Sequence, residues 1–338
     1  MIPVIDITPL RSRGELSEEP TLETIAEAAL NFGAFIVRGH GLSPDLIEAT
    51  YEESERFFRA PLADKMALYI GRNPQHRGYV PVEERGAYGD ERYRSYESFD
   101  LGVDQPSADP HSRAAHRLLG PNIWPERPDF KAKVSAYLSA VTELSLTLCS
   151  ALERVLALPS ETFTGQMRCP TSQLRLLRYL DRAPEERAEV NMGAHTDYEC
   201  LTIIHQRDLG LQVMDPHGEW VEAKAGPDEL LILFGDLLEV WSNGLLKSTP
   251  HRVINAAGER SSLVYFAGLD YDTIVQPDPS LISEQRPAGY AAIHAGQHLE
   301  RMLKRDFPYL AELDSAPERG EPDPIISPFE GRIKKREV

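Results

Sequence analysis

Short apolar segments separated by turn sequences dominate the middle of the chain, from Leu174 to Phe266. One of them, Leu230 to Phe234, is continuously apolar, which is typical of a strand buried on both faces. Between two others, Asp215-Pro216-His217-Gly218 has Pro second and Gly fourth, as a type I turn prefers. The remaining segments that fit a strand are residues 174–179, 201–204, 209–214 and 262–269. This spacing of short strands predicts a sandwich or barrel rather than βαβ units.

Helical periodicity is found on both sides of this segment. From Pro128 to Leu158, apolar residues recur every three or four positions, which predicts one long amphipathic helix packed on the core. Shorter helices are expected at residues 21–32, from the N-cap Ser43 onward, and at 290–305. Residues 70–112 show no clear period, so we expect irregular loops there that can cover a substrate. The chain as a whole is expected to be α+β with a mainly β core.

Composition narrows the function classes. The 338 residues carry a net charge of −17, whereas nucleic-acid binding would require a basic surface. We expect no membrane-spanning run, and the N-terminus lacks the basic and then hydrophobic layout of a signal peptide. The three cysteines are scattered and form no CxxC pair, as expected in a reducing compartment. The expectation is a cytoplasmic protein that acts on a small molecule and binds neither nucleic acid nor membranes.

The sequence His195-Thr196-Asp197 and the later His251 supply two imidazoles and one carboxylate. This ligand set holds Fe(II) on one face and leaves positions open for O2 and a chelating co-substrate. On a strand, residues i and i+2 project to the same side, so His195 and Asp197 can reach one ion. Two histidines and a carboxylate also bind zinc, so a zinc hydrolase or a non-catalytic metal-binding β-barrel is the alternative from another class.

A possible carboxylate-binding pair follows His251 in the sequence. Arg260 and Ser262 lie two positions apart, so on a strand they share a face. The guanidinium can bind a carboxylate through two charge-assisted hydrogen bonds, and the hydroxyl can add a third. Tyr179, on the first predicted strand of the β-rich segment, can supply a fourth. The zinc alternative leaves this pair unexplained.

The residues around these positions resemble the Fe(II)/2-oxoglutarate-dependent oxygenases of the isopenicillin N synthase type. In the β-rich half the resemblance is carried by Met192 to Ile204, Gly210 to Val213, Gly218 to Val221, Gly235-Asp236, Trp241 to Gly244, Lys247 to Val253 and the Arg-x-Ser at 260 and 262. In the N-terminal half it is carried by Ile2 to Asp6, Asn31 to Gly41, Arg77 to Tyr79, Glu97 to Asp100 and Trp124-Pro125.

The resemblance implies a double-stranded β-helix (jelly roll) with N-terminal helices packed around it. Residues 1–168 would form the N-terminal region that wraps the core, residues 169–275 the jelly-roll core, and residues 276–338 a C-terminal helix and tail. The implied activity is oxidation of a small-molecule metabolite by hydroxylation, desaturation or cyclisation, with release of succinate and CO2. Such a reaction is typical of a tailoring step in secondary metabolism.

The resemblance also implies a role for each motif residue. The iron ligands would be His195, Asp197 and His251. The residues that bind 2-oxoglutarate would be Arg260, Ser262 and Tyr179. Fe(II) would be the cofactor, and 2-oxoglutarate and O2 the co-substrates.

Two points bear on which carboxylate the pocket binds. Many plant members of the family have Asn two residues before the matching Tyr, whereas this chain has Leu177, which removes one possible hydrogen bond. In isopenicillin N synthase itself, the matching region binds the substrate's own carboxylate, and no 2-oxoglutarate is used. An oxidase of the same fold that takes its electrons from the substrate is therefore the second hypothesis. Formation of succinate separates the two.

The motifs do not specify the substrate. In similar proteins, the irregular N-terminal region borders the pocket, and Phe266 on the strand after Arg260 can face the substrate. Arg72 is suited to an acidic substrate group. The candidate substrate contacts in the N-terminal region are Arg72, His76, Tyr79, Tyr93 and Tyr96.

Overall fold

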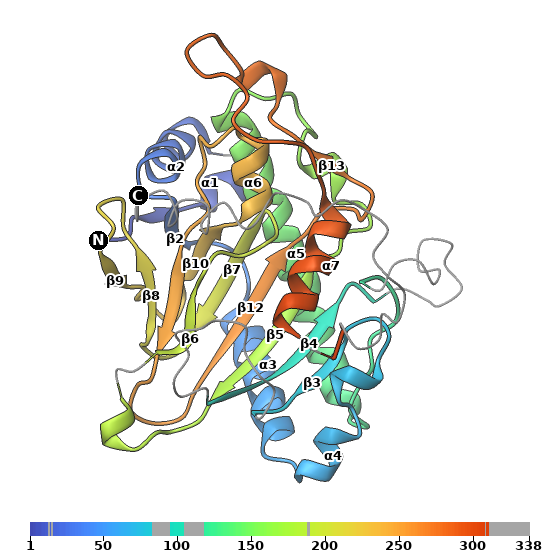
Figure 1. Ribbon diagram of the computed structural model, residues 1–338. Coiled ribbons are helices and arrows are strands. Elements are labelled where there is room, and N and C mark those ends of the chain that lie inside the picture. The colour runs from blue at the N-terminus through green and yellow to red at the C-terminus, as the bar shows by residue number, and fades with distance from the viewer. Residues whose placement is uncertain are drawn as a thin grey trace.

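Two β-sheets form the centre of the molecule, and helices pack on the outside of the larger sheet (Figure 1). The computed structural model describes residues 1–12, 14, 16–82, 95–104, 118–187, 190–307 and 309–310. The large sheet contains, in spatial order, β1 (Val4–Asp6), β2 (Ala34–Arg38), β10 (Leu230–Phe234), β7 (Leu201–Gln206), β12 (Arg260–Ala267), β5 (Gln173–Tyr179), β4 (Tyr96–Gly102) and β3 (Gly78–Val80). The small sheet contains β6 (Val190–His195), β11 (His251–Ile254), β8 (Leu211–Met214) and β9 (Trp220–Glu222).

From β5 onward, the chain alternates between the two sheets, as the winding of a jelly roll requires. Strands β5, β7, β10 and β12 belong to the large sheet, whereas β6, β8, β9 and β11 belong to the small one. Neighbouring strands of this core pair antiparallel, for example β12 with β5 and with β7. The α+β class and the jelly-roll core expected from the sequence are confirmed.

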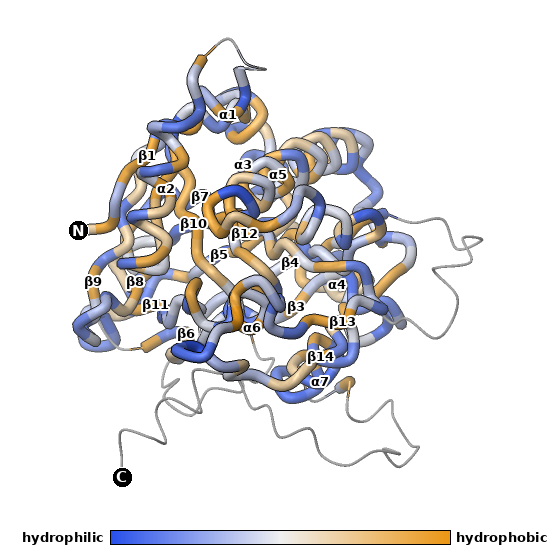
Figure 2. Tube along the Cα trace, turned by 90° about the horizontal axis from the view of Figure 1, so that it is seen from above, coloured by the Kyte–Doolittle hydropathy of each residue, from blue (hydrophilic) through white to orange (hydrophobic). Residues whose placement is uncertain are grey.

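Helices α2 (Glu19–Asn31) and α3 (Pro44–Phe58) each lie against α5 (Pro128–Val155) on the outer side of the large sheet. The side chain of Ser43 caps α3 by accepting a hydrogen bond from the backbone N–H of Leu46. Strands β10 and β7, beneath these helices, are among the most hydrophobic parts of the trace (Figure 2). The shorter elements are α1 (Thr8–Arg11), α4 (Leu62–Met66), α6 (Asp236–Trp241), α7 (Ala295–Asp306) and the two-stranded ladder of β13 (Ile274–Val275) with β14 (Ile293–His294).

Helix α5 is long and apolar enough, by length and composition alone, to cross a membrane, which corrects the expectation of no membrane-spanning run. In the folded molecule, 50% of its most apolar window is buried. Phe130, Val134 and Tyr137 are fully covered, and the helix contacts α3, α2 and β12. The predicted amphipathic stripe thus forms part of the core.

Strands β3 and β4 lie in the region for which irregular loops are predicted, and there the prediction was wrong. All seven residues of β4 are buried, including its charged ones, so the sequence shows no alternation between apolar and polar positions. Glu97 pairs with Lys65 at 2.6 Å and with Arg178 at 2.9 Å. Buried ion pairs of this kind make a central strand look like a polar loop. Residues 83–94 and 105–117 lie outside the described residues, as does Tyr93.

Helix α7 forms near the predicted position and covers one end of the jelly roll. Its apolar side and the residues after it pack with Ile70, Val80 and Leu118 from the N-terminal half. Leu303, Asp306 and Phe307 reach the main pocket from this side. The predicted extended tail, from 317 to 338, lies outside the described residues.

Candidate active site

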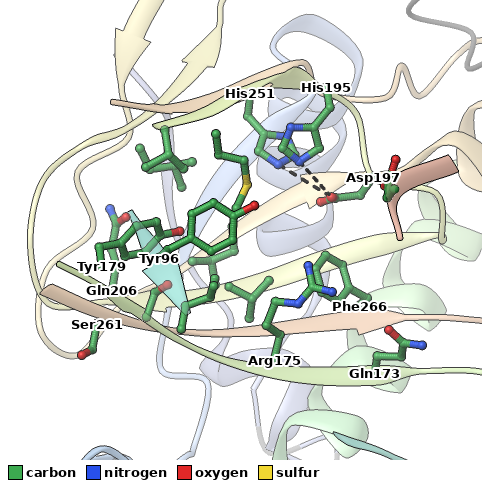
Figure 3. Close-up of a pocket in the computed structure, with 18 of the residues that line it drawn as sticks. Tyr96, Gln173, Arg175, Tyr179, His195, Asp197, Gln206, His251, Ser261 and Phe266 are labelled. Carbon is green, nitrogen blue, oxygen red and sulfur yellow. Dashed lines mark ion pairs between the residues drawn. The ribbon is translucent and has the colours of Figure 1, made fainter. Parts of the chain in front are cut away.

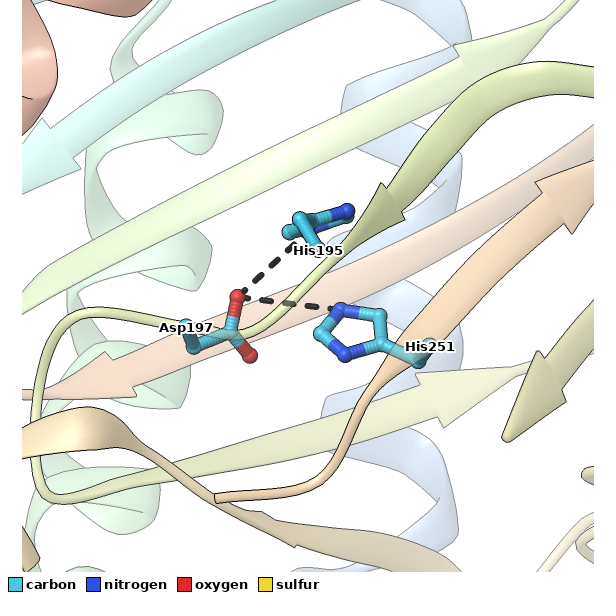
Figure 4. Close-up of side chains that lie close together, drawn as sticks. All are labelled: His195, Asp197 and His251. Carbon is cyan, nitrogen blue, oxygen red and sulfur yellow. Dashed lines mark ion pairs between the residues drawn. The ribbon is translucent and has the colours of Figure 1, made fainter. Parts of the chain in front are cut away.

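The three predicted iron ligands come together at one end of the small sheet (Figure 4). His195 ends β6 and His251 begins β11, and the two residues are directly paired between the strands. Oδ1 of Asp197 is 3.8 Å from Nε2 of His195 and 3.7 Å from Nε2 of His251. Asp197 lies beyond the end of β6, so the turn after the strand, and not the strand pleat, aims its carboxylate at the histidines.

Backbone carbonyls fix the orientation of both imidazoles. Nδ1 of His195 donates to the carbonyl of Gly193 at 2.8 Å. Nδ1 of His251 donates to the carbonyl of Thr249 at 3.0 Å. Because a carbonyl can only accept, each Nδ1 carries the proton, and each Nε2 keeps its lone pair toward the cluster.

The carboxylate and the charge state of the cluster also suit a divalent metal. Thr202 of β7 donates its hydroxyl to Oδ2 of Asp197, which leaves Oδ1 facing the histidines. Burial, and next the neighbouring His251, lower the pKa of His195 to about 3, so its imidazole is neutral at ordinary pH. The three donor atoms lie within 4.8 Å of one another, and in the described part of the chain the cluster has these three members. Two imidazoles and one carboxylate fit Fe(II) and leave room for further ligands.

The three residues predicted to bind a carboxylate meet at the other end of the same pocket. Arg260 of β12 pairs directly with Tyr179 of β5 between the strands, and its guanidinium lies 4.3 Å from the centre of the Tyr179 ring. Ser262 and Tyr179 share a side-chain hydrogen bond. All three residues are nearly buried and line the pocket.

Arg260 is a buried cation held by neutral groups. Nη1 donates to the carbonyl of Leu209 and Nη2 to the carbonyl of Ile254, each at 2.7 Å. Among the described residues, no carboxylate lies within 4 Å of its guanidinium. Burial lowers the pKa of Arg260, because the charged form loses hydration. A buried guanidinium without a counter-ion fits the binding of an anionic co-substrate.

One pocket joins the metal cluster to the carboxylate-binding end (Figure 3). Its volume is about 110 Å³, and both sheets and the end of α7 line it. Between the two ends, the walls are apolar and exclude water. The side chains of this middle part are Leu177, Met192, Ile204, Leu211, Val253 and Val264.

Beyond the metal cluster, the pocket continues to a third group of side chains, which we call the substrate end: Gln173, Arg175, Glu199, Phe266, Leu303, Asp306 and Phe307. Arg175 is held by Asp100, with Nε 2.9 Å from Oδ1 and Nη2 2.7 Å from Oδ2. Its guanidinium lies 5.5 Å from the centre of the Phe266 ring. Burial opposes ionisation of Asp100, but Arg175 outweighs it, and the pKa of Asp100 is lowered.

Two carboxyl groups also border the substrate end. Burial, and next the charge of Asp197, raise the pKa of Glu199 to about 8. Asp306, at the end of α7, accepts hydrogen bonds from the hydroxyl of Tyr198 and from Nε of Arg305. The substrate end therefore combines one fixed guanidinium with two carboxyl groups.

Of the six candidate substrate contacts, Phe266 and Tyr96 line the pocket, whereas Arg72, His76 and Tyr79 do not, and Tyr93 lies outside the described residues. Tyr79 points into the core beside Phe57, and its hydroxyl donates to Glu97. Arg72 is exposed and donates to the carbonyl of Met66. Tyr79 belongs to β3, the edge strand beside β4, and Arg72 to the 3-10 turn next to β3, so both lie at the edge of the large sheet and do not line the cavity.

Arg175 and Gln173 are pocket residues that the sequence analysis missed. They lie four and six residues before Tyr179 on the same strand and share its face, so the two-residue period already contained the signal. Asp306 and Phe307 carry no such local signal. Their position depends on how α7 docks against the N-terminal half.

Comparison with known proteins agrees with this geometry. Residues 2–127 match the family described as non-haem dioxygenase in morphine synthesis N-terminal, and residues 171–268 match the 2OG-Fe(II) oxygenase superfamily. Homoarginine-6-hydroxylase 2-ODD-233 of Oryza sativa subsp. japonica is 30% identical, over 90% of this chain and 97% of that protein. Clavatol oxidase claD of Penicillium crustosum is 30% identical, over 82% of this chain and 88% of that protein.

Solved structures show the same relationship. A full-length Neurospora crassa protein, solved in complex with alpha-KG, aligns with a TM-score of 0.77 and 25% identity, covering 89% of this chain and 95% of that chain. The dioxygenase for auxin oxidation from rice aligns with a TM-score of 0.70 and 26% identity, covering 90% and 95%. These relatives confirm the predicted enzyme class, with Fe(II) and 2-oxoglutarate as cofactor and co-substrate. The chain belongs to the 2OG-Fe(II) oxygenase superfamily and is a 2-oxoglutarate-dependent non-haem iron dioxygenase.

Proposed function

We propose that this enzyme hydroxylates a small amphoteric metabolite, one that carries a carboxylate and a cationic group. In this proposal, His195, Asp197 and His251 hold the iron. The far carboxylate of 2-oxoglutarate binds to Arg260, Ser262 and Tyr179. One observation carries the proposal: the same pocket contains the metal cluster, a buried guanidinium and a set of side chains of mixed charge. The guanidinium of Arg260 lies at one end, the mixed-charge side chains lie at the other, and the metal cluster lies between them.

Bound Fe(II) supplies the oxidising chemistry, in which 2-oxoglutarate, O2 and a C–H bond give succinate, CO2 and an alcohol. The residues of the chain bind the co-substrate and the substrate, orient them toward the metal and exclude water. Arg260 provides charge-assisted hydrogen bonds that set the direction of the co-substrate along the pocket. The apolar middle walls keep water away from the reacting atoms. The substrate end fixes which C–H bond faces the metal.

The substrate class follows from the charges at the substrate end. Arg175, immobilised by Asp100, suits a carboxylate, the carboxylate of Asp306 suits an ammonium or guanidinium group, and the carboxyl group of Glu199, kept mostly protonated near neutral pH by its raised pKa, can add a hydrogen bond. Phe266 adds an apolar surface between them. Four relatives that are 29% to 31% identical are homoarginine-6-hydroxylases, and homoarginine carries a carboxylate, an ammonium and a guanidinium group.

Substrate-stimulated release of succinate tests this proposal. The panel contains L-homoarginine, its methyl ester, its N-acetyl derivative and a straight-chain amino acid that lacks the guanidinium. We expect the intact amphoteric compound to stimulate release most, and each loss of a charged group to weaken the effect. Stimulation by neutral compounds alone would contradict the substrate class. Oxidation of a substrate without any succinate would contradict the use of 2-oxoglutarate.

A matched pair of variants assigns the carboxylate contact. Arg175→Gln should raise the KM for an amphoteric substrate about tenfold or more, the loss expected for a hydrogen bond between charged groups. Because the methyl ester has no carboxylate, its weak turnover should change little. The control is Arg168→Gln, which removes an exposed arginine far from this pocket. An equal loss for the ester and the free acid would show that Arg175 only supports the fold.

A further inference from the structure

Tyr96 stands at the carboxylate-binding end, in a row of three side chains across neighbouring strands. It is paired directly with Tyr179 between β4 and β5, and Tyr179 is paired with Arg260 between β5 and β12. The two tyrosine rings lie 5.7 Å apart, and Tyr96 lines the pocket. Its exposed fraction is only 7%, so the residue is enclosed by the site.

A buried amide network fixes the backbone next to Tyr96. The backbone N–H of Ser95 donates to Oδ1 of Asn191 at 3.0 Å, and the carbonyl of Ser95 accepts from Leu180 N–H at 2.7 Å. Nδ2 of Asn191 donates to Oδ1 of Asn255 at 2.7 Å. This network ties the start of β4 to the small sheet and thereby fixes the backbone next to Tyr96.

The hydroxyl of Tyr96 projects into the cavity, toward the side on which His195, Asp197 and His251 lie (Figure 3). A co-substrate that reaches from Arg260 to the metal must pass through this part of the cavity. Leu177 and Val264, which line the same pocket, offer no hydrogen bond. Leu177 is a diagonal neighbour of Tyr96 on the same face of the sheet.

We infer that Tyr96 is a co-substrate-binding residue, whose hydroxyl donates a hydrogen bond to the oxygen atoms of 2-oxoglutarate at its metal-facing half. The inference rests on the proposed assignment of Arg260, Ser262 and Tyr179 as the anchor of the far carboxylate. The ring of Tyr96 packs on Tyr179, whereas its hydroxyl serves the ligand.

The test removes only the hydroxyl. 2-Oxoglutarate is titrated anaerobically into the Fe(II)-loaded enzyme, and the Kd is taken from calorimetry for wild type and Tyr96→Phe. We expect the Kd to rise about tenfold, as for the loss of one hydrogen bond to a charged group. The absorption maximum of the Fe(II)–2-oxoglutarate complex should also shift, because the donor acts on the chelating atoms. Phe keeps the ring packing on Tyr179, and the Tm without ligand shows that the variant is folded.

Two controls separate the possible failures. Tyr137→Phe removes another buried hydroxyl, one on α5 that has no hydrogen-bond partner among the described residues, and should leave the Kd unchanged. Arg260→Ala should weaken binding strongly. An unchanged Kd and absorption maximum in Tyr96→Phe, with weak binding in Arg260→Ala, overturns the role of Tyr96 and leaves the proposed function intact. If Arg260→Ala also binds normally, the proposed carboxylate site itself is wrong.

Discussion

The backbone of Gly210 lies directly against the guanidinium of Arg260, so that a Cβ on Gly210 would be 2.0 Å from Nη1. Gly210 also has φ at +125°, a conformation that side chains rarely adopt. The position thus allows the loop between β7 and β8 to pass close to Arg260, whose Nη1 donates to the carbonyl of Leu209. A glycine here is required by the close approach of the backbone to the Arg260 side chain.

We therefore predict that Gly210→Ala displaces Arg260 and weakens the binding of 2-oxoglutarate. The Kd, measured anaerobically with Fe(II) present, should rise by at least about tenfold, the size of a lost charge-assisted hydrogen bond. Gly258→Ala is the matched control, because Gly258 also has a positive φ, at +80°, but nothing lies within 4 Å of its added Cβ. Both variants carry backbone strain, so equal weakening in the two would refute the contact explanation.

Thr202 provides a second test, this time of the metal end. Its hydroxyl donates to Oδ2 of Asp197 and thereby keeps Oδ1 toward the histidines. Thr202→Val keeps the volume but loses this bond, and we expect Fe(II) affinity to fall roughly tenfold to a hundredfold. Competition with a coloured chelator measures the change. Thr24→Val, at an exposed threonine of α2, is the control and should bind Fe(II) like wild type. An unchanged affinity in Thr202→Val would mean that Asp197 does not need this support.

His76 should make stability depend on pH through its burial. It is 1% exposed, its Nδ1 is 2.5 Å from the hydroxyl of Tyr309, and burial lowers its pKa to about 3. Between about pH 6.5 and 3, the unfolded chain binds a proton at this residue and the folded chain does not. Stability is therefore full above pH 6.5 and falls as the pH drops, by at most roughly 1.4 kcal/mol per pH unit from this group.

The measurement is the Tm between pH 7 and pH 4 for wild type and His76→Asn. Asn tolerates the positive φ of 54° at this position better than most residues. We expect a shallower fall of Tm with decreasing pH in the variant. The exposed His217→Asn serves as control and should keep the wild-type slope. Identical slopes in all three proteins would show that His76 gains its proton as easily in the folded state as in the unfolded one.

The metal and carboxylate ends could be predicted because each is encoded by a short local pattern. His195-x-Asp197 and Arg260-x-Ser262 each place two functional groups within three residues. The jelly roll then brings these segments together, and the order of short strands already predicted such a fold. One detail differed from the prediction: Asp197 reaches the metal cluster from the turn after β6 and not from the strand itself.

The pocket residues of the N-terminal half could not be predicted in the same way, because burial there depends on partners that are distant in the sequence. Tyr79 and Tyr96 are both aromatic residues of the same N-terminal region, yet one faces Phe57 in the core and the other faces the pocket. The difference arises from β4, whose charged residues are buried by Lys65, Arg175 and Arg178. The sequence does not reveal those ion pairs, so neither β4 nor the faces of its neighbouring strands could be assigned from it.

The most direct test of the account is an anaerobic absorption measurement. Fe(II) and then 2-oxoglutarate are added to wild type, His195→Ala and Arg260→Ala, and the weak visible charge-transfer band of the chelate is recorded. The account predicts a band in wild type, no band in His195→Ala, and in Arg260→Ala a band that appears only at much higher 2-oxoglutarate concentration. A wild-type protein that binds Fe(II) but shows no band, or a band unaffected by either substitution, would contradict the proposed site.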